Sequence, residues 1–441
     1  MAGVPARVIV HDDLRRSRLT VFFRLLLAIP HLIWIALWSV ATFFAAIANW
    51  FATLVLGRPP AALHRFLSAY VRYAVHVNAF LLLGANPFPG FLGKAGSYPV
   101  DVEIPPPGPQ HRLKTLFRLV LAIPAAIVAG VATGGGSGLR GSSSSGDHSA
   151  QILFSLLGIG VWSGLVTGTV AFLAWFAALA RGQMPKGFRN TIAWGLGYSA
   201  QVHAYVFLLT ERYPNSDPGA LGVLDVVPPH PIVLHVDDDL RRSRVTVFFR
   251  LLLAIPHIVW LYLWGVLVEI AIVVNWFAAL ILGRSPSFLH RFLSSYLRYQ
   301  THVFAFLTLV ANPFPGFLGR PGSYPIDLGV APPERQHRLK TLFRLFLAVP
   351  AFFVTFALEF LLFTVSFLAW FAALVTGWMP TGFRNVGAWA IRYVAQTNAY
   401  LYVLTDRYPY SGPEAGEPAP EPVEGGDEPL ELSAEAAPEP A

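Results

Sequence analysis

The chain contains one segment twice. Residues Asp12–His31 read DDLRRSRLTVFFRLLLAIPH, and Asp238–His257 repeat that sequence with a single difference, Leu19 against Val245. A long apolar run follows each copy. Internal self-similarity of this kind indicates two structurally similar halves, so it fixes the organisation of the chain before any residue chemistry is considered.

Each half is itself duplicated, so the chain holds four related units. An FRLxLA(I/V)P motif opens each unit, with its arginine at Arg24, Arg118, Arg250 and Arg344. Unit two is longer because of a Gly/Ser-rich insertion at 134–149. The backbone of such a segment would lack hydrogen-bond partners in hydrocarbon, so the insertion must emerge into water. The motif is therefore predicted to form a short interfacial helix, ended or kinked by its proline.

The composition is that of a membrane protein. Hydrophobic residues make up 54% of the chain and charged residues 13%, whereas soluble domains carry about 25% charged residues. Apolar runs of about 18 residues or more predict an all-α polytopic membrane protein with about eight transmembrane helices, arranged as four helical hairpins. The predicted spans are 31–56, 62–85, 151–180 and 188–210 in the first half and 257–282, 288–311, 350–376 and 383–405 in the second.

These spans divide the chain into a first half (1–220), a second half (221–411) and a tail (412–441). The tail is rich in Pro and Glu and has no Lys or Arg, so it is predicted to be disordered. The linkers between hairpins contain short stretches of alternating residues at 6–11, 98–104, 231–236 and 324–328. Such alternation is typical of strands, and an irregular Pro-rich linker is the alternative.

The predicted topology follows from two crossings per unit. Each hairpin returns to its starting side, so all four units are predicted to enter the bilayer from the same side as parallel repeats. Lys and Arg are more numerous on the side that holds the linkers and both termini. The positive-inside tendency places that side in the cytoplasm. The expected location is the cell (inner) membrane, as a multi-pass protein.

The end of unit four carries a recognisable pattern. Thr376–Pro409 reads TGWMPTGFRNVGAWAIRYVAQTNAYLYVLTDRYP, and unit two holds the related LARGQMPKGFRNTIAWGLGYSAQVHAYVFLLTERYP. The pattern resembles a bacterial membrane family known as domain of unknown function 4389 (DUF4389). Units one and three resemble it more loosely, because NPFP at Asn86 and Asn312 replaces DRYP. The resemblance implies paired membrane helices and brings no activity, substrate or catalytic residue.

The second helix of each hairpin is predicted to carry a polar stripe, because spacings of seven and four residues place side chains on one helical face. The stripe comprises Arg65, Arg72, His76, Arg291, Arg298, His302, Arg392 and Gln396. Charged side chains inside a membrane are costly and mark functional sites. One interpretation is a basic cavity between hairpins that binds an anion or a lipid headgroup. The alternative is that the arginines snorkel to the interface while the histidines bond to backbone.

Two acids, Glu269 and Glu359, fall within predicted spans. A buried carboxylate needs a partner or a proton. Pairing with Arg298 or Arg392 is the structural interpretation, and a proton relay is the functional one. Separately, Gly160, Gly164 and Gly168 form a GxxxGxxxG pattern that favours close helix contact, either within the chain or in an oligomer.

Cations at the start of the interfacial helices are predicted to contact lipid headgroups, each contributing about 1 kcal/mol near an anionic surface. They are Arg15, Arg16, Arg18, Arg24, Arg241, Arg242, Arg244 and Arg250. Anionic membrane lipids are thus the expected partners, and nucleic acid is not. The alternative is that these charges only orient the helices.

Catalytic chemistry is not indicated. The chain has no cysteine, and its 13 histidines do not cluster with carboxylates at ligand spacing. No metal or cofactor is therefore expected. The sequence favours a non-enzymatic membrane bundle that organises lipids or partner proteins. Its alternatives are a transporter or channel for an anionic or amphipathic solute that uses the polar stripe, and a membrane enzyme acting on lipid.

Overall fold

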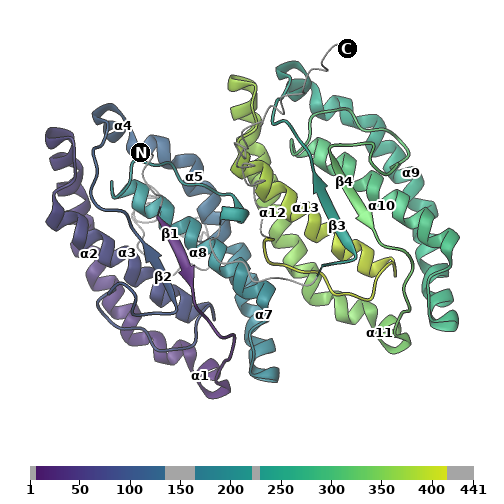
Figure 1. The fold of residues 1–441 in the computed structure, drawn as a ribbon, viewed down its shortest axis with the longest axis horizontal. Coiled ribbons are helices and arrows are strands. Elements are labelled where there is room, and N and C mark those ends of the chain that lie inside the picture. The colour runs from purple at the N-terminus through teal and green to yellow at the C-terminus, as the bar shows by residue number, and fades with distance from the viewer. Residues whose placement is uncertain (1–5, 135–163, 221–228, 415–441) are drawn as a thin grey trace, which may run out of the picture.

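The structure, a computed structural model, describes residues 6–134, 164–220 and 229–414 (Figure 1). The first half contains β1 (Arg7–Val10), α1 (Arg18–Phe22), α2 (Arg24–Leu56), α3 (Ala61–Leu81), β2 (Val100–Glu103), α4 (Arg112–Leu116), α5 (Arg118–Thr133), α7 (Leu165–Arg181), α8 (Lys186–Val206) and the 3-10 helix η2 (Pro218–Ala220). The second half contains β3 (Ile232–Val236), α9 (Arg244–Leu282), α10 (Ser287–Leu307), β4 (Ile326–Val330), α11 (Arg338–Leu342), α12 (Arg344–Thr376) and α13 (Thr381–Leu401).

The linker strands form in all four predicted places. They pair as two separate antiparallel sheets of two strands each, β1 with β2 and β3 with β4. Val8 lies opposite Val102, and Leu234 lies opposite Leu328. In β1, β2 and β4 the alternation in the sequence arises because alternate side chains are buried, as with Val100 and Val102 of β2. In β3 only Ile232 is buried.

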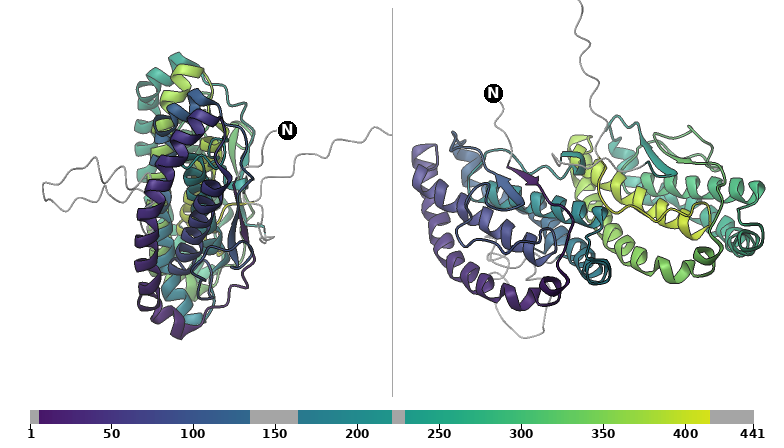
Figure 2. Two further views of the ribbon diagram at one scale, coloured as in Figure 1. Left: turned by 90° about the vertical axis from the view of Figure 1, so that its left-hand side faces the viewer. Right: turned by 60° about the horizontal axis from the view of Figure 1, so that its bottom comes forward.

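The elements form three layers, which Figure 2 shows edge-on in its left view. The long helices α2, α5, α7, α9 and α12 make one face of the molecule. Helices α3, α8, α10 and α13 form the middle layer, where α3 packs between α2 and β2, and α10 packs between α9 and β4. The strands and their linkers make the opposite face. Within every layer the helices and strands run along the slab rather than across it.

The long helices continue through their prolines, so the prediction of a separate interfacial helix that ends there is wrong. Pro30, Pro256 and Pro350 lie inside α2, α9 and α12. A proline inside a helix costs about 3 kcal/mol, and burial of the inner face of these helices offsets that cost. In units one, two and four the helix breaks earlier, at the phenylalanine before the motif arginine, for example Phe23.

Each linker hydrogen-bonds to the hairpin turn of the other unit in its half. The turn after α2 ends at Gly57 (φ 71°), whose carbonyl accepts a hydrogen bond from the Gln110 amide at 2.8 Å. Conversely, the Gly182 carbonyl after α7 accepts from the Arg16 amide at 2.9 Å. The second half repeats both bonds, from Gln336 to Gly283 and from Arg242 to Gly377.

These reciprocal bonds correct the predicted topology. Because α2 ends beside the start of unit two and α7 ends beside the start of unit one, the long helices of the two units run in opposite directions. They are not parallel repeats. The turn at Gly57 and the linker at Gln110 are hydrogen-bonded to each other, so turns and linkers cannot lie on opposite sides of a membrane as predicted.

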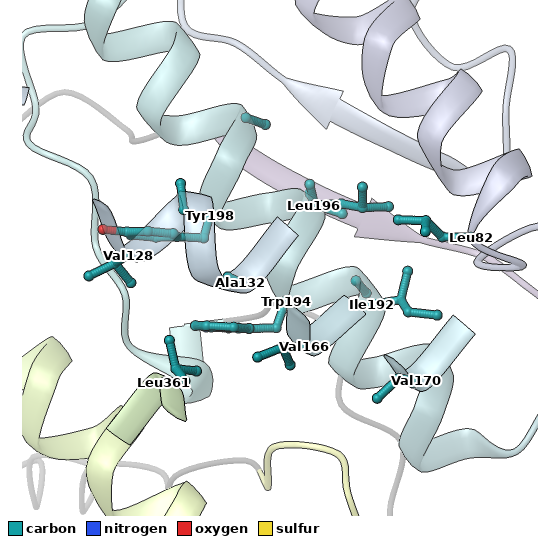
Figure 3. Packing of buried hydrophobic residues seen from close by; sticks show 14 of the residues in the cluster. Leu82, Val128, Ala132, Val166, Val170, Ile192, Trp194, Leu196, Tyr198 and Leu361 are labelled. Carbon is teal, nitrogen blue, oxygen red and sulfur yellow. The ribbon is translucent and has the colours of Figure 1, made fainter. Parts of the chain in front are cut away.

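The two halves lie side by side (Figure 1), and one hydrophobic cluster spans both of them, while two further clusters lie within the second half. Trp194 of α8 and Trp389 of α13 pack edge to face with ring centres 4.9 Å apart. Figure 3 shows Leu361 of α12 approaching Trp194 and Val166 from the other half. The Asn190 amide also donates to the Tyr410 hydroxyl across this boundary at 2.9 Å.

Three helices of the described residues are long and apolar enough to cross a membrane by length and composition: α2, α9 and α12. Helices α5 and α7 are apolar but shorter. The predicted span 151–180 is described only from residue 164, and the Gly/Ser insertion lies outside the described residues except for Gly134. The predicted disordered tail is described only to Glu414.

The glycine pattern is used inside the chain where it is described. Gly164 caps the start of α7, and a Cβ placed there would lie 2.5 Å from the Thr133 backbone of α5. This close approach is an internal helix contact. Gly168 lies in α7, and Gly160 falls outside the described residues.

Candidate functional site

The polar stripe of α3 meets the strand that lies along it. Nε2 of His76 lies 2.9 Å from Oδ1 of Asp101, and Nε of Arg72 lies 3.4 Å from the same oxygen. His76 is fully buried, and Tyr98 lies 5.0 Å from its ring. An arginine, a histidine and an aspartate therefore form one cluster between the middle layer and β2.

The linker before β2 completes this cluster. Arg72 also donates to the carbonyls of Val102 and Gly93, at 3.2 and 3.3 Å. The Gly96 amide donates to Oδ2 of Asp101 at 2.5 Å. Gly93 has a φ of +57°, and a Cβ placed there would lie 2.1 Å from the Ala69 carbonyl oxygen. The linker can approach α3 this closely only with glycine at position 93.

Unit three repeats the cluster with the same geometry. His302 lies 2.8 Å from Asp327, and Nε of Arg298 lies 3.6 Å from it. Arg298 donates to the Leu328 and Gly319 carbonyls at 2.9 and 3.1 Å. The two clusters thus hold their cations by carbonyls and one carboxylate each, which is how buried charges are satisfied in a protein interior.

The carboxylates of Asp101 and Asp327 stay charged to lower pH than those of free aspartates. Burial opposes the charge on Asp101, but hydrogen bonds from His76 and from the Gly96 and Val102 amides outweigh burial and lower its pKa. The same balance of burial against hydrogen bonds from His302, Gly322 and Leu328 lowers the pKa of Asp327. Each aspartate is therefore an anion that ties its linker to the helix beneath.

In unit four the stripe binds the chain that follows α13. Arg392 forms an ion pair with Glu414 and donates to the Gly412 carbonyl at 2.5 Å. The side-chain amide of Gln396 donates to the backbone carbonyl of Ile232 in β3 at 3.2 Å. Its Oε1 accepts from the backbone amide of Tyr410 at 3.0 Å. The equivalent arginine is missing from unit two, where Gly197 leaves a cavity of about 70 Å³ lined by Arg7, Gln201 and Asp217 among others.

The stripe therefore does not converge on a basic cavity between hairpins. Arg72, His76, Arg298, His302, Arg392 and Gln396 each face their own linkers, strands or chain end. Arg65 and Arg291 are exposed at the starts of α3 and α10 and join neither cluster. Sequence reasoning missed Asp101 and Asp327. Their signal was the recurrence of YPVD and YPID at one spacing from Arg72 and Arg298.

The predicted pairing of the buried acids is wrong. Glu269 is exposed on α9 and Glu359 is half-buried on α12. Arg298 pairs with Asp327 instead, and Arg392 pairs with Glu414. Linker and terminal carboxylates reach these arginines because the strand layer covers the middle helices directly.

Half of the predicted headgroup contacts are buried and cannot reach lipid. Arg16 pairs with Asp12 at 2.7 Å and donates to the Leu83 carbonyl at 2.9 Å. Arg24 donates to the Phe80 and Ala85 carbonyls at 2.5 and 3.1 Å. Arg242 and Arg250 repeat these roles in unit three. Arg15, Arg18, Arg241 and Arg244 remain exposed, as a headgroup role requires.

The buried motif arginines complete the ends of the middle helices. Two positions after the end of each of these helices the chain has a residue of positive φ, at Leu83, Leu208, Leu309 and Val403. The last carbonyls of a helix need partners from outside its own ladder of hydrogen bonds. The motif arginine of each unit lies over an aromatic ring near that end, 4.1 to 4.5 Å from its centre. In three units it also donates to a carbonyl of the last turn, which accepts a second bond from the amide of the residue with positive φ.

The exposed residues of the long helices are apolar along most of their length, with Glu269 of α9 as an exposed exception. On α2, Leu25, Val40 and Val55 are 76%, 59% and 72% exposed, while the inner face buries polar residues such as His31 and Asn49. Leu251, Val266 and Ile281 of α9 are exposed in the same way, as are Leu345, Phe360 and Val375 of α12. We call this continuous face of α2, α5, α7, α9 and α12 the outer apolar surface.

Four exposed arginines mark the rim of the outer apolar surface. Each donates to a carbonyl in the last turn of a long helix in the other unit. They are Arg18 to Ala180, Arg112 to Val55, Arg244 to Val375 and Arg338 to Ile281, at 2.9 to 3.0 Å. Such cations also complement the negative end of the helix dipole. Arg112 and Arg338 were not predicted as headgroup contacts, although they occupy the place of Arg18 in their units.

Among the described residues, no group of three or more His, Asp or Glu could hold a metal ion. Four segments of the chain, residues 18–92, 147–216, 244–318 and 338–411, match the family described as Domain of unknown function (DUF4389). These segments correspond to the four units. No curated protein and no solved structure matches the chain.

Proposed function

The chain belongs to the DUF4389 family, and from this premise we propose that it is a non-enzymatic protein of the cell membrane that gathers anionic lipids around itself. The observation that carries the proposal is the rim. Exposed arginines, each bonded to the end of a long helix, surround an apolar surface. An apolar face bordered by cations matches acyl chains bordered by lipid phosphates.

Vesicles with self-quenching labelled phosphatidylglycerol test this proposal. Gathering of anionic lipid by the reconstituted protein should lower the fluorescence of the label. Replacing the four rim arginines together, Arg18→Ser, Arg112→Ser, Arg244→Ser and Arg338→Ser, should remove most of that effect. Labelled phosphatidylcholine is the control and should not respond. Unchanged phosphatidylglycerol fluorescence with the unaltered protein would refute the proposal.

A transporter or channel for an anionic solute is the second candidate, because the stripe does hold buried cations. Its difficulty is that these cations are already bonded to linkers. Sulfate release from loaded vesicles separates the two candidates. If the protein releases sulfate and the pair Arg72→Leu and Arg298→Leu abolishes release while membrane insertion persists, transport replaces the lipid role.

A further inference from the structure

We infer that the long helices lie in the plane of the membrane, with the outer apolar surface set into a single leaflet and the strand layer in water. The occupant of the outer apolar surface is thus the lipid of one leaflet. This inference deepens the proposed membrane role and rests on it. Three independent observations support it: the place of the strands, the length of the apolar faces and the direction of the helices.

The two-stranded sheets would not be stable in the hydrocarbon of the bilayer. Each sheet has only two strands, so its outer edges have no neighbouring strand to pair with, and lipid offers backbone groups at such edges no partners. The cluster of Arg72, His76 and Asp101 lies beside the middle of α3. If α3 crossed the bilayer, this ionised cluster and its linker would lie near the bilayer centre. With α3 parallel to the membrane, the same cluster stays on the watery side.

The apolar faces are too long for an upright helix. Helix α2 has 33 residues and α9 has 39, which gives lengths of about 50 and 58 Å at about 1.5 Å per residue. The hydrocarbon core is about 30 Å thick. The exposed apolar residues extend from Leu25 at one end of α2 to Val55 at the other. A helix lying flat buries this whole face, whereas an upright helix leaves both ends in water.

The hydrogen bonds between linkers and turns also favour helices that lie in the membrane plane. Within each half, the long helices run in opposite directions, yet they lie on the same side of the slab (Figure 2). Their exposed apolar residues therefore belong to one outer surface. An approximate two-fold axis perpendicular to the slab relates the two units. When that axis is also the membrane normal, both units present their apolar faces and rim arginines to one leaflet.

Amphipathic helices that lie at the membrane interface use this arrangement. Their apolar face enters the leaflet by about 5–10 Å while cations meet the headgroups. Arg18 and Arg112 are exposed next to exposed leucines, Leu19 and Leu113. The rim therefore has both the charge and the apolar neighbours that a headgroup layer requires.

Single cysteines test the inference cleanly, because the chain has none of its own. Arg58→Cys lies in the turn after α2, Gln183→Cys in the turn after α7, and Lys94→Cys in the linker after α3, all at exposed positions. A membrane-impermeant maleimide is applied to bacterial spheroplasts and to inverted vesicles, which expose opposite faces. We expect all three cysteines to be labelled in the same preparation.

The outcomes distinguish failure of the single-leaflet inference from failure of the proposed membrane role. Labelling of Arg58→Cys and Lys94→Cys in opposite preparations would show that α2 and α3 span the bilayer. Labelling of Arg58→Cys and Gln183→Cys in opposite preparations would show inverted spanning units. Either result overturns the single-leaflet inference and leaves the membrane role intact. Recovery of the protein in the soluble fraction would overturn the membrane role itself.

A depth measurement provides a second readout. Nitroxide labels at Leu25→Cys, Val40→Cys and Val55→Cys sample the two ends and the middle of α2, and their depth follows from oxygen against nickel-chelate accessibility in vesicles. In-plane helices should place all three labels at one depth. A label at position 40 that is deepest, with both end labels near the headgroups, would overturn the inference.

Discussion

Arg24 lies 4.5 Å from the centre of the Phe80 ring and donates a hydrogen bond to the carbonyl of the same residue. It thereby joins the first turn of the long helix α2 to the last turn of the middle helix α3. Arg250 with Phe306 and Arg344 with Tyr400 repeat this arrangement. The most conspicuous cation of the sequence motif therefore binds the chain itself.

Replacing this arginine should destabilise the fold. Arg24→Met would remove the donor to the buried Ala85 carbonyl and leave the Phe80 carbonyl with a single 3.2 Å bond from the Leu83 amide. We therefore expect the free energy of unfolding to fall by about 3 kcal/mol. Denaturant unfolding in detergent micelles, followed by circular dichroism, measures the change. Arg15→Met is the control, because Arg15 is exposed and its loss should cost less than about 0.5 kcal/mol. Equal losses in the two variants would contradict this role.

Acid should loosen the linkers through Asp101 and Asp327. Their pKa values are lowered below the ordinary 3.8 by hydrogen bonds that outweigh burial. A group with a lowered folded-state pKa contributes stability that is present above its unfolded pKa. That contribution is lost as pH falls from about 4 through the folded pKa. The pair Asp101→Asn and Asp327→Asn should therefore lose this part of the pH dependence.

Unfolding midpoints measured between pH 7 and pH 3 provide this test. Asp237→Asn is a suitable control, because Asp237 is exposed in the linker after β3. The unfolding midpoint of the control should change with pH as that of the unaltered protein does, from pH 7 to pH 3. A double variant that loses stability on acidification as steeply as the unaltered protein would rule out the two aspartates as the cause.

Two neighbouring glycines should respond very differently to alanine. A Cβ at Gly93 would lie 2.1 Å from the Ala69 carbonyl oxygen, whereas one at Gly96 would meet nothing within 4 Å. Both have positive φ, so Gly96→Ala should cost about 1–2 kcal/mol for the backbone alone. Gly93→Ala must also move the linker away from α3 and should cost clearly more. Unfolding midpoints of the two variants provide the test. Equal midpoints for Gly93→Ala and Gly96→Ala would contradict the prediction.

The two halves should assemble from separate fragments. Residues 1–224 and 225–441, produced together, should co-purify because helices α5 and α7 pack against α12. Trp389→Ala removes the contact with Trp194 and should lower the recovered complex at least tenfold, equal to about 1.4 kcal/mol. Trp378→Ala serves as the control, because Trp378 is exposed and stacks on Arg241. Equal recovery with both variants would contradict the assigned interface.

The sequence predicted the parts of this fold better than their assembly. The repeats, the paired helices and all four linker strands follow from self-similarity, apolar runs and alternation such as Val100 and Val102. The continuation of α2 through Pro30 does not follow, because the packing that outweighs the proline comes from other units. Asp101 was missed because its partner lies 25 residues away in the chain, and no periodic pattern joins them.

The role of the arginines depended on contacts that a sequence does not reveal. Arg18 and Arg24 both lie at the start of an apolar segment, and the sequence predicted a contact with lipid headgroups for both. In the structure Arg24 is buried and bonds to the Phe80 and Ala85 carbonyls at the end of α3, whereas Arg18 is exposed. The direction of the helices was mispredicted for a similar reason, since counting two crossings per unit assumes that each helix is upright.

The hydrogen bonds that each linker gives to the turn of the other unit have a consequence for any polypeptide that contains a single such unit. A polypeptide with one unit has a turn like that at Gly57 and a linker like that at Gln110, but it cannot bring its own two together. A second copy, turned through half a revolution, would supply both. Such a polypeptide should exist as a homodimer. Each half of the present chain would then correspond to that dimer with its two units joined in one polypeptide.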